Sequence, residues 1–412
     1  NVSNVKCIQL VNENPVILRC RTDYYWVSFV FSKLFALKDK ILSLNFGFKS
    51  VPKIILGIDI SSSAIKLIEV EPNQDGYRVL SYGVLPLPPG AVVDREIIDV
   101  EETAKVLKQV YEDSKTSSSN VAVAVSGASV ISNVIDVPVA LSEKQLEARV
   151  ELEAETIIPF PLDQVNLDFA VVGQNPLSKD ELRVQVVACQ RDSVDRRLDV
   201  IIRAGLHPTV VDVESFAFAR AYKQLIGTAT TNPRQSDHMV KKRIGSDTQE
   251  VVALIDIGAS VFTFVVISQE MVVYSLEQPF GGKQLTEDIQ RHYNLSWAEA
   301  GKAKRKGGLG SDYVETMLDP FKDLLIQHIK RSIQVFYSST EIKKIDRLML
   351  SGGVSKVTGL PDEISKATGI PTEIVDLLKN ITLSSKVSRS RLLSDMPAMM
   401  LAFGLALSKE QK

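Results

Sequence analysis

The sequence predicts an α/β fold with two related domains that face one shared ligand. Its main support is a phrase that occurs twice, as LGIDISSSAIKLIEVE at residues 56–71 and as ALIDIGASVFTFVVIS at residues 253–268. Each copy runs from an apolar strand to an aspartate, turns on small residues and returns as a second strand. A chain of 412 residues is also too long for one ordinary core, which favours two or more domains.

Composition excludes several classes of protein. The chain is 45% hydrophobic and 24% charged, as in ordinary globular proteins, and its net charge of −2 argues against a nucleic-acid partner. The three cysteines, at positions 7, 20 and 189, have neither a metal-binding nor a disulfide spacing, which is typical of a reducing compartment. No apolar run is long enough to predict a transmembrane segment.

Residues 1–51 differ from the rest of the chain and are expected to form a poorly ordered extension. They show no clean strand or helix period before about residue 26. Residues 26–46 also have the pattern of an amphipathic helix, so an interfacial anchor is the alternative.

The first domain is expected at residues 52–226 and begins with three strands. A helix follows over residues 97–111, then the buried strand VAVAVSG and a helix opened by Ser142 with Gln145 as a capping box. Pro159 and Pro161 end that helix, because proline cannot continue it. The stretches VNLDFAVVG and LRVQVVACQ predict a hairpin, and a helix, a strand and a helix complete the domain.

The second domain is expected at residues 250–393, after a polar and aperiodic linker at residues 227–249. It repeats the opening strands and continues with helices over residues 283–292, 296–305 and 319–340. The strand RLMLSGG, a helix and the strand PTEIVD follow. Residues 394–412 are expected to form a closing helix that returns to the first domain.

The two repeated turns have the chemistry of a phosphate clamp. Small residues after the aspartate let backbone N–H groups approach a phosphate closely. The carboxylates of Asp59 and Asp256, at the strand ends, suit a Mg²⁺ ion that keeps most of its waters. The alternative is two unrelated hairpins with aspartate in the turn, a common turn residue.

Two further features fit a nucleotide. Gly352 and Gly353 follow a buried strand, where a nucleotide can lie against bare backbone. Glu299 and Lys302 lie one turn apart on a predicted helix, where they could reach an adenosine. Ser296 with Glu299 is also a capping box, so Glu299 has a structural alternative.

Glu214 lies at the junction of a predicted strand and helix. A carboxylate there could orient an attacking water, or it could simply occupy the first helical turn, where the dipole favours an acid. The sequence contains no GxxxxGK[ST] loop, no GxGxxG between strand and helix, and no kinase HRD or DFG set. These absences argue against the P-loop, Rossmann and protein-kinase families.

The motifs IDISSSAIKL, IDIGAS and LSGGVSKVTGL resemble the two phosphate motifs and the adenosine motif of the actin-like ATPases, which include actin, FtsA and sugar kinases. Within that superfamily the chain is similar to the PilM family of type IV pilus assembly. The segments ELEAETIIPFPLDQVNLDFAVVG, RDSVDRRLDVIIRAGLHPTVVDVESFAFARAY and GGKQLTEDI carry the similarity. The resemblance implies an actin-like fold with two RNase H-like domains around a central nucleotide cleft, and an inserted subdomain at about residues 121–190.

The resemblance also implies a set of residues for ATP and Mg²⁺. Asp59 and Asp256 would face the metal through water, and Glu214 falls where ATPase relatives place a water-orienting residue. The remaining implied nucleotide-binding residues are Ser61, Ser62, Ser63, Lys66, Gly258, Ala259, Ser260, Gly281, Gly282, Glu299, Lys302, Gly352, Gly353 and Val354.

The first turn departs from the family pattern, because Ser61 stands where relatives usually have glycine. Serine keeps its N–H but adopts positive φ at a cost of roughly 1–2 kcal/mol if the turn requires it. We therefore expect nucleotide binding to survive, with at most slow ATPase activity.

The partner follows from the resemblance alone. PilM-like proteins bind the cytoplasmic N-terminal peptide of the inner-membrane protein PilN, in an extended form suited to a groove. The chain would then be a cytoplasmic ATP-binding adaptor, peripheral at the inner membrane, that links the PilN/PilO platform to the pilus motor ATPases and so to twitching motility. Candidate groove residues are Phe160, Leu162 and Phe169, which have a core role as their alternative.

Two other functions remain open. A sugar or small-molecule kinase on the same fold needs a carboxylate base aimed at an acceptor hydroxyl, and Glu214 with the two phosphate aspartates are the candidates. An FtsA-like filament former is the third possibility, weakened by an ending, LALSKEQK, without an amphipathic membrane tail.

Overall fold

The computed structural model describes residues 6–7, 54–73, 76–175, 177–227, 250–379 and 381–408. The expected linker therefore lies outside the described residues, apart from Gly227, which ends a helix. Most of the expected N-terminal extension does too. Lys6–Cys7 form strand β1, which pairs in parallel with strand β11 (His207–Val213).

The first sheet has seven strands in the order β1-β11-β7-β2-β3-β4-β17. The strands β2, β3 and β4 form an antiparallel meander, and β7 and β11 extend it in parallel from β2. Their bounds are β2 Leu56–Ile60, β3 Ala64–Asn73, β4 Gly76–Pro86, β7 Asn120–Val125 and β17 Ile381–Leu383.

The second sheet repeats this plan in the order β14-β13-β12-β15-β16. Its meander is β12, β13 and β14, and the parallel strands β15 and β16 extend it from β12. The bounds are β12 Val251–Ile257, β13 Phe262–Ser268, β14 Met271–Gln278, β15 Arg347–Ser351 and β16 Thr372–Ile374. The two copies of the repeated phrase thus open two sheets of equivalent topology, as the sequence predicts.

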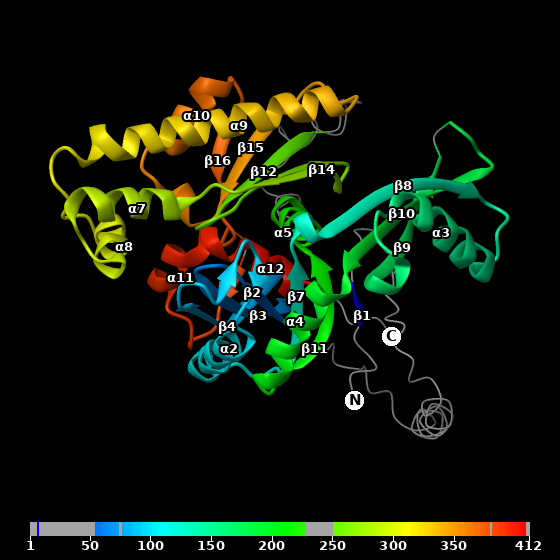
Figure 1. The fold of residues 1–412 in the computed structure, drawn as a ribbon, viewed down its shortest axis with the longest axis horizontal. Helices are drawn as coiled ribbons and strands as arrows, with labels where there is room; N and C mark the ends of the chain where they lie inside the picture. The colour runs from blue at the N-terminus through cyan, green and yellow to red at the C-terminus, as the bar shows by residue number, and fades with distance from the viewer. Residues whose placement is uncertain are drawn as a thin grey trace.

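Helices separate and cover the two sheets (Figure 1). The helices α5 (Glu214–Gly227) and α12 (Met400–Ala406) lie between them and share one apolar cluster with both sheets. The helices α2 (Val100–Ser114) and α4 (Arg191–Arg203) cover the outer face of the first sheet. The outer face of the second sheet is covered by α7 (Gly282–Tyr293), α8 (Trp297–Lys306), α9 (Asp319–Ser339) and α10 (Leu360–Thr368).

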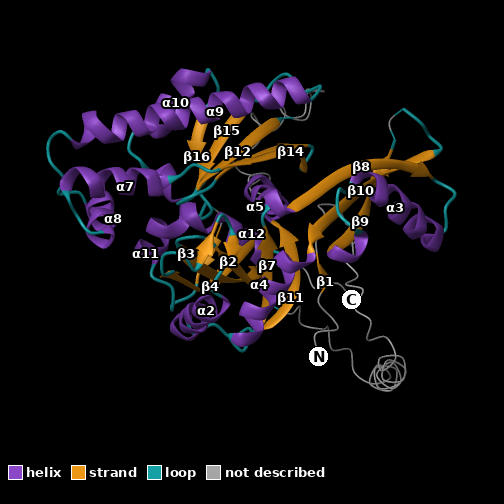
Figure 2. Cartoon of the chain, in the orientation of Figure 1, coloured by secondary structure: helices purple, strands orange, loops and turns teal. Residues whose placement is uncertain are grey.

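A separate three-stranded sheet projects from the first domain (Figure 2). It has the order β8-β10-β9 and packs against α3. The bounds are β8 Val130–Pro138, α3 Glu143–Ile157, β9 Val165–Gln174 and β10 Glu181–Gln190. The strand β8 has no counterpart among the sequence expectations. The expected boundary near residue 121 falls inside β7, which belongs to the larger sheet, so the subdomain begins at β8.

The chain returns to the first domain earlier than residue 394. The strand β17 already pairs with β4, and residues 375–407 contribute to the cluster between the sheets. The closing segment is divided into α11 (Arg389–Asp395), a short 3-10 turn and α12. α12 lies so close to β2 that a Cβ on Gly57 would come within 1.8 Å of the Ala402 carbonyl oxygen.

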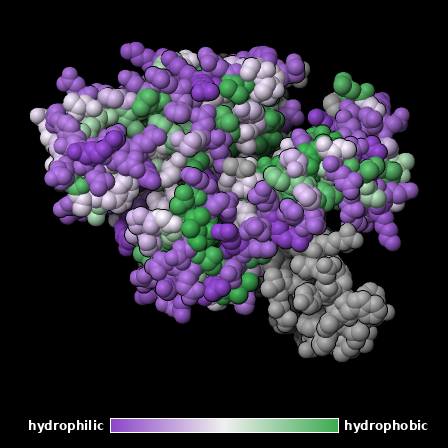
Figure 3. Space-filling model, in the orientation of Figure 1, coloured by the Kyte–Doolittle hydropathy of each residue, from purple (hydrophilic) through white to green (hydrophobic). Residues whose placement is uncertain are grey.

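The described helices include none that combines the length and the apolarity needed to cross a bilayer. Figure 3 shows apolar and polar surface interspersed over the visible face, with apolar surface on the three-stranded subdomain. Side chains there that are at least 39% exposed include Val134, Val139, Leu152 and Phe160.

Candidate functional site: a cleft between two repeated turns

The two repeated turns share an equivalent backbone hydrogen bond and face each other. The Ser61 N–H donates to the Ala64 carbonyl at 3.1 Å, and the Gly258 N–H donates to the Val261 carbonyl at 3.0 Å. These are equivalent positions of the two copies. The hydroxyl groups of Ser62 and Ser260, one from each turn, are 3.1 Å apart and hydrogen-bonded. The structure therefore brings the tips of the two domains together at the expected phosphate motifs.

Serine fits the first turn without strain. Ser61 is absent from the described residues that have positive φ, so the cost expected for a left-handed serine does not arise. Its hydroxyl donates to the Ala64 carbonyl at 2.9 Å, and Lys66 Nζ lies 3.3 Å from the same hydroxyl oxygen. The departure from glycine therefore adds a hydrogen bond across the turn instead of distorting it.

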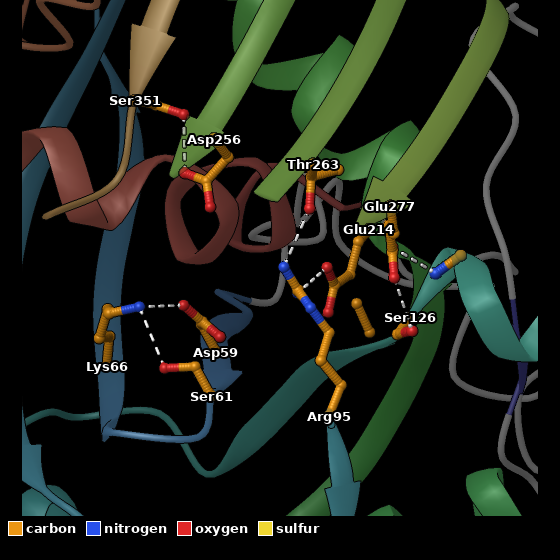
Figure 4. A network of polar contacts seen from close by, with 12 residues as sticks. Asp59, Ser61, Lys66, Arg95, Ser126, Glu214, Asp256, Thr263, Glu277 and Ser351 are labelled. Atoms are coloured by element: carbon orange, nitrogen blue, oxygen red, sulfur yellow. Dashed lines mark hydrogen bonds and ion pairs between the residues drawn. The ribbon is translucent and has the colours of Figure 1, made fainter. Parts of the chain in front are cut away.

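Each turn is preceded by an aspartate, which is buried in the first copy and half-buried in the second (Figure 4). Asp59, at 5% exposure, accepts from Lys66 Nζ at 2.5 Å, and Asp256 accepts from the Ser351 hydroxyl at 2.7 Å. Burial raises the pKa of Asp256, and the nearby charge of Asp59 adds to that effect. Two carboxylates facing one space suit a hydrated Mg²⁺, which takes few protein oxygens directly. Among the described residues, no three His, Cys, Asp or Glu side chains gather as a direct metal site.

The start of α7 closes one side of the second turn. The N–H of Gly282 donates to the Gly258 carbonyl at 3.0 Å, and the N–H of Lys283 donates to the Ala259 carbonyl at 2.7 Å. A Cβ on Gly281 would come within 2.5 Å of the Ala259 carbonyl oxygen, so only glycine fits there. Gly281 and Gly282 thus lie beside the second turn, and their part in nucleotide binding stays a prediction.

The glycines after β15 have different roles. Gly352 has φ of +84°, and a Cβ there would approach the Ile257 carbonyl oxygen to 2.3 Å, so its backbone path requires glycine. Gly353 has no atom within 4 Å of its Cβ position and leaves bare backbone beside open space. Val354 is buried and would contact a Cβ on Gly282 at 3.0 Å. Of these two glycines, Gly353 is therefore the one where an added side chain would enter open space.

Helix α8 carries the predicted pair Glu299 and Lys302, and a further lysine, Lys304, that contacts α7. Glu299 forms a capping box with Ser296, accepting from its N–H at 2.8 Å. Glu299 and Lys302 line a pocket of 440 Å³ with the glycine-rich loop at residues 307–310. The side chain that points toward α7 is Lys304, whose Nζ donates to the Gly282 carbonyl at 2.6 Å. Burial lowers the pKa of Lys304 to about 8.

Glu214 lies at the floor of the cleft, where β11 becomes α5. It is 4% exposed and pairs with Arg95, a residue that the sequence analysis did not single out. Burial raises the pKa of Glu214 to about 7, although the charge of Arg95 opposes the shift. The other side of the Arg95 guanidinium donates from Nη2 to the Thr263 hydroxyl at 3.0 Å. Since Thr263 is on β13, Arg95 connects the first domain with the second.

A second contact joins the domains beside Arg95. The Glu277 carboxylate, at the end of β14, accepts from the Ser126 hydroxyl at 3.1 Å and from the Gly127 N–H at 2.8 Å. Gly127 begins the 3-10 helix η1 (Gly127–Ser129), which leads directly into β8 of the three-stranded subdomain. The cleft is therefore in contact with the base of that subdomain.

The three candidate groove residues differ in exposure. Leu162 and Phe169 are partly buried against apolar clusters that α3 and the three-stranded sheet share. Phe160 is 39% exposed in the turn that follows α3. Of the three, Phe160 is the side chain most available for contact with another molecule.

The family is decided by the match of its sequence model. The model described as type IV pilus assembly protein PilM matches residues 57–410. This chain belongs to the PilM family. Its fold is the mixed α/β actin-like ATPase fold. In sequence it is also 23% identical to the cell division protein FtsA of Bacillus subtilis (strain 168) over 278 residues, which are 62% of this chain. The chain spans 58% of the length of that FtsA.

Solved structures give a corresponding result. A chain of a PilM-PilN type IV pilus biogenesis complex is 27% identical, with a TM-score of 0.70, over 87% of this chain and 98% of that chain. The ethanolamine utilization protein EutJ from Carboxydothermus hydrogenoformans is 14% identical, with a TM-score of 0.47, over 91% of this chain and 97% of its own. The similarity to the PilM-PilN structure thus extends over most of this chain and nearly all of the other.

Proposed function

We propose that this chain binds ATP with Mg²⁺ between the two repeated turns and acts as a nucleotide-dependent adaptor in type IV pilus assembly. The observation that carries the proposal is the direct contact of Ser62 with Ser260, with Asp59 and Asp256 behind the two turns. Turn N–H groups suit phosphate oxygens, and the two carboxylates suit the waters of a bound Mg²⁺.

Different residues of the chain would contact the phosphates and the nucleoside part of the nucleotide. Lys66 is 15% exposed on its side chain and can donate to a phosphate from its position beside Asp59. The bare backbone at Gly353, with Lys304 nearby, would border the nucleoside part. Glu214, the candidate for orienting a water, is paired with Arg95 in the absence of nucleotide. We expect at most slow ATP hydrolysis.

The partner proposal rests on the family and on the related PilM-PilN complex. We propose that the cytoplasmic N-terminal peptide of PilN binds in an extended form near the three-stranded subdomain. The chain would be cytoplasmic and peripheral at the inner membrane, and it would connect the PilN/PilO complex to the pilus motor ATPases. Exposed Phe160 is a candidate contact for the peptide.

Calorimetry of the purified chain tests both parts. MgATP is titrated first, and a synthetic PilN N-terminal peptide is then titrated with MgATP, with MgADP and without nucleotide. We expect saturable binding of MgATP and a peptide affinity that depends on the nucleotide. Absence of peptide binding in all three states would contradict the adaptor function. Turnover near about 10 s⁻¹ would favour a kinase instead.

A further inference from the structure

Arg95 is held in the cleft by an unusual local backbone. It is the second central residue of the hairpin between β5 (Val92–Val93) and β6 (Glu96–Ile97). Asp94 and Arg95 have φ of 48° and 64°, the left-handed pair of a type I′ turn. Residues other than Gly, Asn and Asp seldom adopt such angles, and strained positions of this kind concentrate at functional sites. The hairpin is thus shaped to project Arg95 inward.

The guanidinium of Arg95 is buried but incompletely satisfied. Its two terminal nitrogens contact Glu214 and Thr263, whereas Nε is buried and has no hydrogen-bond partner among the described residues. A guanidinium carries five N–H donors in a rigid fork that matches carboxylate and phosphate oxygens. Arg95 therefore retains capacity for an additional or alternative oxygen ligand.

The position of Arg95 relative to the turns favours a phosphate as that ligand. Figure 4 shows the guanidinium in the same cleft as Asp59 and Asp256, with Glu214 beside it. Burial alone lowers the pKa of Arg95, but the charges of Glu214, Glu277, Asp256 and Asp59 together outweigh it and raise the pKa. Arg95 therefore stays charged and, like Lys66, pairs with a carboxylate of the cleft.

We propose that Arg95 binds the terminal phosphate of the bound nucleotide and so distinguishes a triphosphate from a diphosphate. Without nucleotide its guanidinium pairs with Glu214; when a triphosphate is bound, the guanidinium turns from Glu214 to the terminal phosphate. A diphosphate lacks that group and leaves the Arg95–Glu214 pair in place. This inference rests on the proposed ATP site and assigns to it the residue that distinguishes ATP from ADP.

Hydrogen bonds around the hairpin connect Arg95 to the three-stranded subdomain. Arg197 Nη2 donates to the Arg95 carbonyl at 2.7 Å, and Arg197 Nε donates to the Ala124 carbonyl at 2.8 Å. The next residue, Glu96, accepts from the hydroxyl of Ser129 at 3.0 Å. Ser129 immediately precedes β8. A movement of Arg95 would therefore displace Glu96, the next residue, and through it the base of the subdomain.

The test compares the affinities for MgATP and MgADP by calorimetry in four proteins: wild type, Arg95→Met, Glu214→Gln and the double variant. Wild type is expected to bind MgATP more tightly. Arg95→Met should reduce the ratio of ATP to ADP affinity about tenfold or more, because a charge-assisted contact is lost. Glu214→Gln should increase the ratio, since the phosphate no longer competes with a carboxylate. The double variant should have the same ratio as Arg95→Met, because the increase expected for Glu214→Gln requires the Arg95 guanidinium.

Arg196→Gln is the matched control. Arg196 contacts the same hairpin, donating to the Ile97 carbonyl at 2.9 Å, but its side chain lies outside the cleft network. It should leave the ratio unchanged. Three results would overturn the role of Arg95 while leaving the ATP site intact. They are an unchanged ratio in Arg95→Met, a reduced ratio in Glu214→Gln, and equal affinities of wild type for MgATP and MgADP. Failure of wild type to bind any nucleotide would overturn both. The double variant carries no unpaired buried charge, so it remains informative if Arg95→Met is poorly folded.

Discussion

Replacement of Gly404 by alanine tests how the two domains are joined. The helices α12 and α5 cross at this glycine, where a Cβ would lie 2.0 Å from the Ala217 carbonyl oxygen. The helices must separate by about 1 Å to accept the methyl group, in a region where every residue of α12 is buried. Overpacking of this kind costs roughly 1–3 kcal/mol, and the helix propensity of alanine returns at most about 1 kcal/mol. We therefore expect a net loss of about 1–2 kcal/mol in the free energy of unfolding.

Thermal unfolding followed by circular dichroism measures the effect, with Gly301→Ala as the matched control. Gly301 is also within a helix, but the nearest atom to its Cβ position is Arg305 Nη1 at 3.7 Å, an ordinary contact. The control should therefore gain up to about 1 kcal/mol from propensity alone. Gly404→Ala should lower the melting temperature by roughly 1–2 °C, because the unfolding entropy grows with the length of the chain. A melting temperature equal to or above that of wild type would refute the close crossing of α5 and α12.

Three other variants probe the cleft. Gly353→Val should leave the melting temperature within about 2 °C of wild type, yet weaken MgATP binding about tenfold or more, because its side chain enters open space beside the bare backbone; unchanged affinity would place the nucleotide elsewhere. Relative to Glu214→Gln, wild type should lose free energy of unfolding as pH rises from 4.5 to 7, because the unfolded chain ionises this carboxyl first. Relative to Lys304→Met, wild type should gain free energy of unfolding between pH 8 and 10.5, since the folded protein releases the Lys304 proton before the unfolded chain does. Urea unfolding across each pH range checks both signs, and a flat difference would contradict the burial of the group concerned.

The fold was largely readable from the sequence because its repeated unit has a strong local signature. An apolar strand, an aspartate, small residues and a second strand identify each meander, and the parallel strands β7 and β15 beside it are mainly apolar. The strand β8 gave no such signal, since most of its side chains are at least partly exposed and only one is buried. Its strand conformation comes from pairing with β10, a tertiary contact that local pattern does not encode.

The site was readable only in part, for reasons of helical phase and long-range contact. Glu299 and Lys302 share one helical face and line one pocket, and their part in nucleotide binding stays a prediction. Lys304, two residues beyond Lys302, turns toward Gly282, and this orientation depends on how α8 packs against α7. Arg95 gave no sequence signal, because neither residue of the turn it shares with Asp94 is glycine or asparagine. Its partners come from distant parts of the chain.

The central claim, a MgATP site between the two repeated turns, is tested most directly by titrating MgATP into wild type and Asp256→Asn. Asp256 is half-buried near the end of β12 and accepts from the Ser351 hydroxyl, a contact that the asparagine side-chain oxygen can preserve. The change therefore removes the carboxylate charge while keeping the shape. We predict saturable binding to wild type that requires Mg²⁺, and a loss of about tenfold or more in Asp256→Asn at an unchanged melting temperature. Equal, Mg²⁺-dependent binding by both proteins would contradict the claim.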